Sequence, residues 1–385
     1  VTRDSGVTWY GKEIYKNIGA GFDLFGWGYD GNGASGRNST SPGDTSSPIQ
    51  IGASGSGWGH VYMGLDGALM NFYGKLDGSL WSAGYNNRGN LGLNDIEKRS
   101  SPTQIGTDTT WSRSGLISRH SPKVLKTDGT LWTWGGNGQG NLGLNQTSNF
   151  KLSSPTQIPG TTWSAAAGVG SRTLALKTDG SLWSWGYNEY GQCGQNDTIK
   201  KSSPTQVGTD TTWAKLPVNA GEGARAAGAA IKTNGTLWMW GSNYFAGKLG
   251  LNTRTDVYSS PIQIGTDTTW ANVATGDKVS MATKTDGTLW MMGDNERGAL
   301  GQNNLIYYSS PVQVPGTNWH LTHFRHIANS EGTMAMKQDG TLWSWGNSGS
   351  GRNGLNDNTE RSSPAQVAGT WEAIGGGSAI SGLKA

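Results

Sequence analysis

Three of the five histidines in this sequence stand close together, and histidine is the commonest metal ligand in proteins. They are His320, His323 and His326. In a strand, successive side chains point to opposite faces, so His320 and His326 would share one face and His323 would lie on the other. No cysteine or carboxylate joins the three at the spacing of a zinc site. The pattern therefore predicts no metal site.

Two short stretches carry the oxygen ligands that calcium prefers, Asp-Asn-Glu at 294–296 and Asn-Asp-Asn at 356–358. Neither stretch has the ligand spacing of a recognised calcium-binding loop. We therefore predict that both are solvent-exposed loops and not calcium sites. The sequence contains no nucleophile elbow, no Walker loop and no cysteine–histidine pair at catalytic spacing. We therefore predict a noncatalytic protein without a cofactor. The alternative is an enzyme whose carboxylates meet only at the centre of the fold.

Aromatic and charged residues in glycine-rich loops are better candidates for binding. Exposed tyrosine, phenylalanine and arginine are enriched where proteins contact partners. An unusually long connection that contains the three histidines adds two more residues, because insertions within repeats map to loops and often to binding faces. The predicted binding residues are Tyr85, Arg88, Tyr187, Tyr190, Tyr244, Phe245, His323 and Arg325. The alternative is that the aromatic residues fill space between neighbouring repeats.

These residues are positioned by a repeat that runs through the whole chain. The glycine that closes each Leu-Trp-x-Trp-Gly core, or its variant, recurs at intervals of 51 to 56 residues. It stands at Gly28, Gly84, Gly135, Gly186, Gly241, Gly293 and Gly346. All but one of the 19 tryptophans occupy three positions of this repeat, which predicts that they pack between successive units. A fixed period near fifty indicates a repeat architecture.

Each repeat is predicted to form four short strands. The copy that begins at Thr161 has apolar or alternating runs separated by turn signals, and no helical spacing. The Thr-Asp-Gly between its second and third runs predicts a tight turn, with Gly180 at positive φ. Another copy has Asn234 in place of this aspartate, so the position serves the turn and not carboxylate chemistry. The proline of Ser-Ser-Pro-x-Gln lacks an amide hydrogen, which predicts that the last strand is the outer edge.

Four strands per repeat, arranged radially, predict an all-β fold. It is a seven-bladed β-propeller of four-stranded antiparallel blades. The first copy begins late, at Gly21, and the last ends early, at Ala385, yet together they make one complete repeat. We therefore predict that the ring is closed by pairing of the N- and C-terminal segments. Residues 1–20 would form a leader outside the regular repeat, and residues 21–385 a single propeller domain.

The element Gly-x-Asn-x-x-Gly-x-Leu-Gly-x-Asn, as in residues 84–94, resembles the regulator of chromosome condensation repeat family over about residues 21–385. The resemblance implies a seven-bladed propeller. The family's eukaryotic namesake exchanges guanine nucleotide on a small GTPase and binds chromatin. The wedge that accompanies that activity has no match here, and the family's usual histidine before the second strand is absent. The repeats are more similar to bacterial and phage-type members, which tend to sit on surfaces or in virions.

Composition narrows the class of partner. Charged residues make up only 15% of the chain, and a net charge of +3 from 30 basic and 27 acidic residues gives no nucleic-acid footprint. The one cysteine, Cys193, replaces a leucine of the repeat, which predicts a small buried hydrophobic residue. No apolar run is long enough to span a bilayer.

Together these features predict a structural or recognition module on a virion or extracellular surface. Examples are a phage tail, fibre or capsid-decorating component, or a bacterial surface adhesin. The predicted partner is a protein subunit of a larger assembly, or a cell-surface receptor or glycan, with no nucleic acid and no membrane insertion. The alternative is a soluble protein-interaction regulator, such as a small-GTPase exchange factor like the family namesake.

Overall fold

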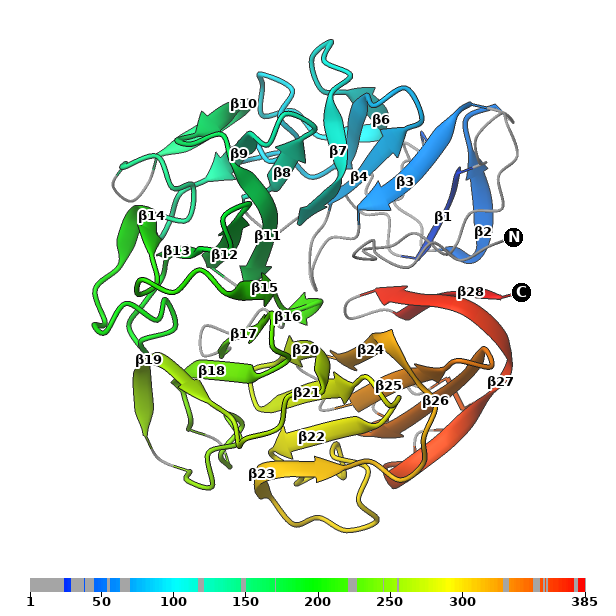
Figure 1. The fold of residues 1–385 in the computed structure, drawn as a ribbon. Helices are drawn as coiled ribbons and strands as arrows, with labels where there is room; N and C mark the ends of the chain where they lie inside the picture. The colour runs from blue at the N-terminus through cyan, green and yellow to red at the C-terminus, as the bar shows by residue number, and fades with distance from the viewer. Residues whose placement is uncertain are drawn as a thin grey trace.

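Every regular element in the described part of the chain is a β-strand, and the computed structural model arranges the strands as a ring (Figure 1). The predicted leader, residues 1–20, lies outside the described residues and stays a prediction. The structure describes residues 24–28, 38, 45–53, 56–62, 70–116, 121–146, 150–169, 171–220, 227–244, 246–254, 256–327, 332–348, 354–355, 357, 359–376 and 380–384.

Six blades repeat one order of four antiparallel strands. The first strands all begin at a tryptophan: β3 (Trp58–Tyr62), β7 (Trp111–Leu116), β11 (Trp163–Val169), β15 (Trp213–Lys215), β20 (Trp270–Thr275) and β24 (Trp319–Ile327). The second strands all end at a lysine: β4 (Met70–Lys75), β8 (Lys123–Lys126), β12 (Arg172–Lys177), β17 (Gly228–Lys232), β21 (Val279–Lys284) and β25 (Gly332–Lys337). We number the blades 1 to 6 in this order.

The third strands carry the Leu-Trp-x-Trp-Gly core or, in β5 and β22, a variant of it: β5 (Leu80–Gly84), β9 (Leu131–Gly136), β13 (Leu182–Gly186), β18 (Leu237–Ser242), β22 (Leu289–Gly293) and β26 (Thr341–Gly346). The fourth strands each contain Ser-Ser-Pro: β6 (Arg99–Gln104), β10 (Lys151–Ile158), β14 (Lys201–Gln206), β19 (Val257–Gln263), β23 (Tyr308–Gln313) and β27 (Arg361–Gly376). In blades 1 to 5 the fourth strand forms the outer edge of the sheet, as the proline predicts. A further strand, β16 (Asn219–Ala220), pairs in parallel with β20.

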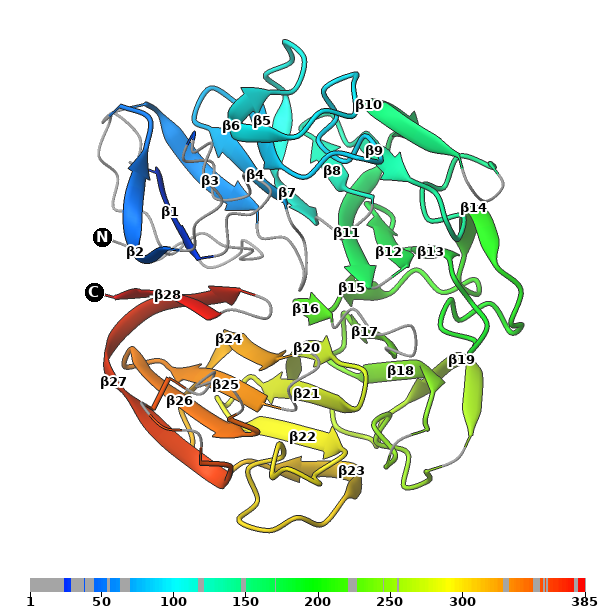
Figure 2. The same cartoon turned by 180° about the vertical axis from the view of Figure 1, so that it is seen from behind.

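Blade 7 is divided between the two ends of the chain. The long β27 completes blade 6 and continues into blade 7, where it pairs with β28 (Ile380–Lys384). The N-terminal end contributes β1 (Leu24–Gly28) and β2 (Thr45–Ile51), which pair with each other. Figures 1 and 2 place these two halves next to each other in the ring. Among the described strands no ladder joins β28 to β1, so the predicted pairing of the N- and C-terminal segments stays a prediction.

Strand registers identify the two halves as parts of one blade. Trp371 pairs with Lys384 just as Trp163 pairs with Lys177 in blade 3. Phe25 pairs with Gln50 at the place where Trp183 pairs with Gln206. The seven-bladed all-β architecture predicted from the repeat is therefore confirmed.

Antiparallel pairing gives the ring two faces. The Thr-Asp-Gly turns join second to third strands at one end of each blade, and we call that end the turn face. The loops after Trp-Gly join third to fourth strands at the opposite end, which we call the loop face. In blades 2 to 6 the first strand begins on the turn face beside the turn of the preceding blade; in blade 4, for example, the amide of Trp213 donates to the carbonyl of Gly180 (3.1 Å).

The apolar cores lie between blades. One core joins Leu174, Leu182 and Val207 of blade 3 to Trp213 and Trp240 of blade 4. The prediction that periodic tryptophans pack between units is confirmed, because four third-strand tryptophans are buried and donate their indole hydrogen to a carbonyl of the preceding blade. These bonds join Trp134 to Asn90, Trp185 to Asn141, Trp240 to Gln192 and Trp345 to Ala299.

The glycine-rich element after Trp-Gly serves the same junctions. A methyl group on Gly191 would lie 2.6 Å from the Cα of Ser259, and one on Gly194 would lie 2.9 Å from the indole nitrogen of Trp240. Both partners belong to the next blade. Both glycines also have positive φ, of 68° and 72°, which disfavours any side chain. The glycines of this element thus allow neighbouring blades to pack in close contact.

Candidate functional site

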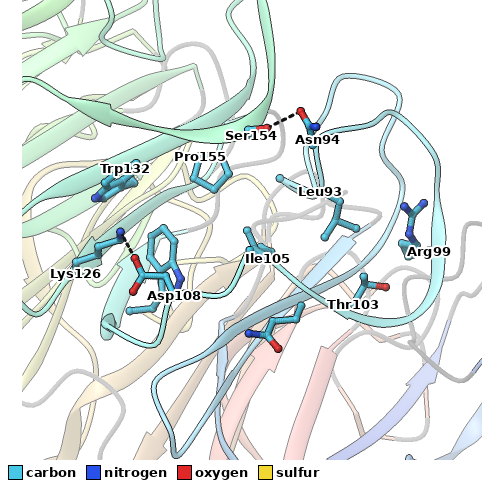
Figure 3. Close-up of a pocket in the computed structure, with 14 residues that line it drawn as sticks. Leu93, Asn94, Arg99, Thr103, Ile105, Asp108, Lys126, Trp132, Ser154 and Pro155 are labelled. Atoms are coloured by element: carbon cyan, nitrogen blue, oxygen red, sulfur yellow. Dashed lines mark hydrogen bonds and ion pairs between the residues drawn. The ribbon is translucent and has the colours of Figure 1, made fainter.

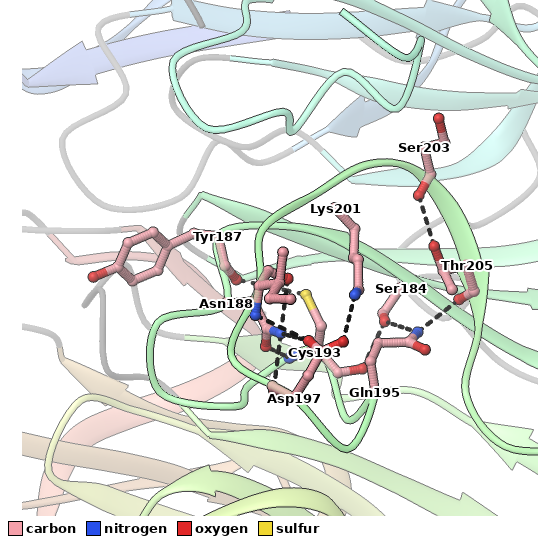
Figure 4. Close-up of polar contacts among 10 residues, drawn as sticks. Ser184, Tyr187, Asn188, Cys193, Gln195, Asp197, Lys201, Ser203 and Thr205 are labelled. Carbon is pink, nitrogen blue, oxygen red and sulfur yellow. Dashed lines mark hydrogen bonds and ion pairs between the residues drawn. The ribbon is translucent and has the colours of Figure 1, made fainter. Parts of the chain in front are cut away.

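The loop after β13 shows how the loop face is built (Figure 4). Asn188 is buried, and its amide nitrogen donates to the carbonyls of Asp197 (3.1 Å) and Ile199 (3.0 Å). Its side-chain oxygen accepts from the amide of Cys193 (2.7 Å). Other blades use a buried asparagine at the same place: Asn86, Asn137, Asn243 and Asn295. This asparagine is therefore the frame of the loop and not a ligand-binding group.

The remaining polar groups in Figure 4 also hold the loop together. Lys201 pairs with Asp197 at 2.5 Å. The amide nitrogen of Gln195 donates to the hydroxyl of Ser184 (2.8 Å) and to the carbonyl of Thr205 (2.9 Å). Cys193 is fully buried, and burial raises the pKa of its thiol to about 11. Cys193 is therefore a small buried residue without thiolate character, as the sequence predicted.

Outside this frame lies a cluster of two tyrosines with a carboxylate and an ammonium group. The rings of Tyr187 and Tyr190 meet edge to face with centroids 6.3 Å apart. The hydroxyl of Tyr187 donates to Glu189 (2.7 Å), and Lys200 lies 3.3 Å from the same carboxylate. These hydrogen bonds, first from Tyr187 and then from Lys200, lower the pKa of Glu189. We call Tyr187, Glu189, Tyr190 and Lys200 the tyrosine cluster.

The other predicted binding residues are spread over several blades. Tyr85 and Tyr244 are exposed, at 36% and 43%, on the loops of blades 1 and 4. Arg88 is exposed, but its side chain lies against blade 2, where a methyl on Gly136 would be 3.0 Å from it. Among the predicted residues whose side chains the structure describes, Tyr187 and Tyr190 are the pair that it brings together. Phe245 and the side chains of His323 and Arg325 lie outside the described residues, although the backbone of the last two belongs to β24.

The described residues contain no cluster of three histidine, cysteine or acidic side chains that could hold a metal ion. In the two acidic stretches, Asp294 lies 3.8 Å from Lys278, and Asp357 pairs with Arg361 at 2.8 Å. Within the same part of the chain, no helix is long and apolar enough to cross a membrane.

The turn face holds an arrangement that sequence reasoning missed. The lysine that ends each second strand places its ammonium group over two indoles, those of the first-strand tryptophan and of the first tryptophan in the third strand. For Lys177 the distances to the ring centroids are 5.0 Å to Trp163 and 3.9 Å to Trp183. The same contact recurs at Lys75, Lys126, Lys232, Lys284 and Lys337. The signal was present, since this lysine precedes the turn in all six copies.

The aspartates of the turns have the structural role that the sequence predicted. The carboxylate of Asp179 accepts hydrogen bonds from the amide (2.9 Å) and hydroxyl (2.6 Å) of Ser181. That hydroxyl in turn accepts from the indole nitrogen of Trp183 (2.8 Å). The hydrogen bonds from Ser181 lower the pKa of Asp179.

A pocket of about 530 Å³ opens at the rim between blades 1 and 2 (Figure 3). Its walls include Arg99 and Thr103 from β6, Trp132 from β9 and Pro155 from β10. The charged groups in it are already paired, Lys126 with Asp108 and Arg99 with Asp95. Because these charged side chains already have partners, the described lining of the pocket offers no unpaired charged group for catalysis.

Comparisons with known proteins agree with this architecture. The family model described as the regulator of chromosome condensation (RCC1) repeat matches residues 77–113, 128–175, 179–219 and 286–331. The matched segments of this chain are therefore repeats of the regulator of chromosome condensation type. A second model of the same repeat matches residues 164–192. The matched segments lie in blades 1 to 6, although in blades 4 and 6 they reach only the first strand.

Individual relatives extend the likeness. The chain is 28% identical over 276 residues to the RCC1 domain-containing protein RUG3, mitochondrial, of Arabidopsis thaliana, covering 69% of this chain and 60% of the relative. It is 28% identical over 296 residues to the ultraviolet-B receptor UVR8 of the same plant, covering 72% of this chain and 63% of the relative. The chain thus spans about three fifths of the length of these curated relatives.

A solved structure shows the same fold. The crystal structure of Prp20p from Saccharomyces cerevisiae superposes with a TM-score of 0.72 at 18% identity, covering 95% of this chain and 92% of that one. That protein was described with its binding properties to Gsp1p and histones.

The relatives overturn part of what the sequence predicted. They are eukaryotic RCC1-type proteins, among them a mitochondrial protein, a light receptor and Protein RCC2 of Mus musculus. The prediction that the chain is a structural or recognition module on a virion or extracellular surface is therefore wrong. The predicted location at such a surface is wrong for the same reason. A virion assembly, a cell-surface receptor and a glycan are wrong as partners. The bacterial and phage-type qualifier of the resemblance is not supported. The low charge of the chain is a property of its hydroxyl- and amide-rich repeat and is not specific to a compartment.

Proposed function

We propose that this chain is a noncatalytic regulator that binds a protein partner through its loop face. Within the described residues, the loop asparagines, turn aspartates and third-strand tryptophans that recur from repeat to repeat are engaged in loops, turns and blade junctions, which favours structural roles for them. What differs between blades is the outer layer of the loops. Rigid propeller blades that present variable loops are suited to recognition of another protein.

The tyrosine cluster is the observation that carries the proposal. Asn188 fixes the loop from within, while Tyr187 points away from that frame in Figure 4. The side chains of Glu189 and Lys200 are 54% and 47% exposed. Aromatic rings beside a paired carboxylate and ammonium combine apolar area with directional contacts, as protein interfaces do. Because the loop is already ordered, binding would cost little conformational entropy.

The candidate partner is a small GTPase, and the candidate activity is acceleration of nucleotide release. The resemblance to the family namesake supports this choice, as does the reported binding of the similarly folded Prp20p to Gsp1p. The chain would then act by stabilising the nucleotide-free form of the GTPase, which requires binding energy and no catalytic side chain of its own.

The test is a nucleotide-release assay with a panel of small GTPases loaded with fluorescent GDP. We expect the full chain to accelerate release from at least one of them. Replacement of both aromatic rings, Tyr187→Ala with Tyr190→Ala, should reduce that acceleration at least tenfold. The matched control is Leu76→Ala, which removes a hydrophobic side chain, 45% exposed, from the turn face and should change nothing. If no GTPase responds, or if both variants act alike, the proposed activity through the loop face is wrong.

A further inference from the structure

The six lysines on the turn face differ in one respect that divides the blades into two groups. In blades 2, 4 and 5, an aspartate from the loop that precedes the first strand pairs with the lysine. Lys232 lies 2.5 Å from Asp210, Lys284 lies 2.5 Å from Asp267, and Lys126 pairs with Asp108. These loops share the sequence Gly-Thr-Asp-Thr-Thr-Trp. In this group, the chain itself supplies a carboxylate to each ammonium.

Blades 1, 3 and 6 keep the lysine and both indoles but lack that aspartate. Their loops end in Gly-Ser-Gly-Trp, Pro-Gly-Thr-Thr-Trp and Pro-Gly-Thr-Asn-Trp. Within the described residues, no ion pair involves Lys75, Lys177 or Lys337. The contacts with the rings persist, at 4.6 Å from Lys337 to Trp343 and 3.9 Å from Lys177 to Trp183.

A glycine stands where the carboxylate would be. Gly316 has a φ of 99°, and a methyl group on it would lie 3.7 Å from Nζ of Lys337 and 3.9 Å from the indole nitrogen of Trp319. That indole nitrogen is buried and has no hydrogen-bond partner in the described part of the chain, which is equally true of Trp270 in blade 5. The loop around Gly316 is exposed, so the space in front of the ammonium is open to a ligand. Gly160 in blade 3 has a similar φ of 108°, a conformation that an aspartate would adopt only under strain.

We propose that the turn face binds carboxylate groups at Lys75, Lys177 and Lys337, each held by an ammonium group that two indoles keep in place. The carboxylate would take the position that Asp267 occupies in blade 5. An acidic side chain of a partner protein is the source we favour, because it would present its carboxylate on a loop as this chain does in the other three blades. This site lies on the face opposite the tyrosine cluster and does not depend on the proposed function.

Nearby negative charge does not exclude a second carboxylate. Asp339 of the adjacent turn interacts electrostatically with Lys337. The same is true of Asp286 and Lys284 in blade 5, where Asp267 nevertheless pairs directly with the lysine. Lys284 therefore already interacts with two carboxylates of the same chain, those of Asp267 and Asp286. A partly buried ammonium over indole rings interacts with a carboxylate more strongly than a fully solvated lysine would.

The experiment follows the six ammonium groups of the full chain by proton–nitrogen NMR during titration with sodium acetate at constant ionic strength. We expect saturable shifts for Lys75, Lys177 and Lys337, and none for Lys126, Lys232 and Lys284. The variant Asp267→Ala should transfer the acetate response to Lys284, and Lys337→Met should remove one of the three original responses. Equal shifts for all six lysines, or no new response at Lys284, would overturn the proposal.

Two peptides distinguish the source of the carboxylate. Acetyl-Gly-Glu-Gly-amide is titrated beside its glutamine counterpart, which carries no charge. Binding of the glutamate peptide at least threefold tighter than acetate, with no response to the glutamine peptide, supports a side chain of a partner. An affinity no higher than that of acetate overturns the partner as the source and assigns the sites to small carboxylates. A response to the glutamine peptide contradicts recognition of a carboxylate altogether.

Discussion

The indole nitrogen of Trp185 donates a hydrogen bond to the main-chain carbonyl of Asn141, 3.1 Å away in the preceding blade. Both residues are buried, at 0% and 4% exposure. Since a buried carbonyl without a donor costs about 1 to 3 kcal/mol, each such bond couples the stability of one blade to its neighbour. The ring is therefore held by specific polar contacts as well as by apolar packing.

Replacement of Trp185 by phenylalanine should lower the free energy of unfolding by about 2 kcal/mol or more, because it leaves the Asn141 carbonyl without a donor and creates a cavity. The control is Trp183→Phe, two residues away on the same strand, whose indole bonds only to Ser181 in its own blade. Chemical denaturation of both variants measures the difference. Equal losses would show that the bond between blades contributes nothing specific.

Replacement of Gly191 by alanine tests the close contact between blades 3 and 4. The new methyl group would approach the Cα of Ser259 to 2.6 Å, at a residue whose φ is 68°. Gly208→Ala is the matched control, because its φ is 60° but no atom lies within 4 Å of the new methyl. Both variants should lose about 1 kcal/mol to backbone strain. We expect Gly191→Ala to lose clearly more in thermal unfolding, and an equal loss would contradict the contact.

Lys123 is a fully buried lysine with no ion pair among the described residues, where the equivalent residues of blades 3 and 5 are Leu174 and Met281. Its ammonium donates to the carbonyl (2.8 Å) and hydroxyl (2.6 Å) of Ser121. Burial lowers the pKa of Lys123 from 10.5 to about 7. The substitution Lys123→Met should therefore stabilise the fold at pH 7, by about 4 kcal/mol if the whole shift is recovered.

The pH dependence of this effect has a definite sign. Between about pH 7 and 10.5 the unfolded chain keeps the Lys123 proton while the folded chain has released it. Wild-type stability should therefore rise with pH across this window relative to Lys123→Met, and the advantage of the variant should shrink. Denaturation at pH 7 and pH 10 measures this change. An advantage that stays constant would contradict a neutralised buried lysine.

Asp267, in contrast to Lys123, stabilises the fold when it is charged, and this stabilisation is lost in acid. Hydrogen bonds from Lys284 and Thr269 lower the pKa of Asp267 from 3.8 to about 2. The ionised carboxylate therefore stabilises the fold above pH 4, and this contribution is lost as the pH falls towards 2. Asp267→Asn should be less stable than wild type at pH 7, with a gap that closes between about pH 4 and 2. The gap should be modest because the side chain is 34% exposed. A gap that is independent of pH would exclude the ion pair as its cause.

The fold was accessible from the sequence because its signals are local. Turn residues such as Gly180, the proline of each outer strand and the alternation of apolar residues act within a few positions. The period of the repeat then predicted the number of blades, and the incomplete copies at Gly21 and Ala385 predicted that the two ends of the chain share one blade. The structural roles of Cys193 and of the turn aspartates followed from the same local logic.

The candidate sites were harder to predict because burial and charge pairing are not local. Tyr187 and Tyr190 were recognised as aromatic residues of one loop, but their link to Lys200 depends on how Asn188 folds that loop. The lysines of the turn face were overlooked because each lies far in sequence from the first-strand tryptophan it contacts. The virion assignment failed for a different reason, since composition describes the repeat and not its cellular setting.

What the sequence alone specifies can thus be distinguished from what only the tertiary structure decides. Local propensities and the fifty-residue period specify strands, turns, blade order and blade number without reference to anything distant. The packing of neighbouring blades decides that Asn141 accepts a hydrogen bond from Trp185. The folding of each single blade decides that Lys284 pairs with Asp267, while Lys337 lies near Gly316. Hydrogen bonds and ion pairs depend on separations of a few ångströms, and residues some fifty positions apart reach those separations only when neighbouring blades pack.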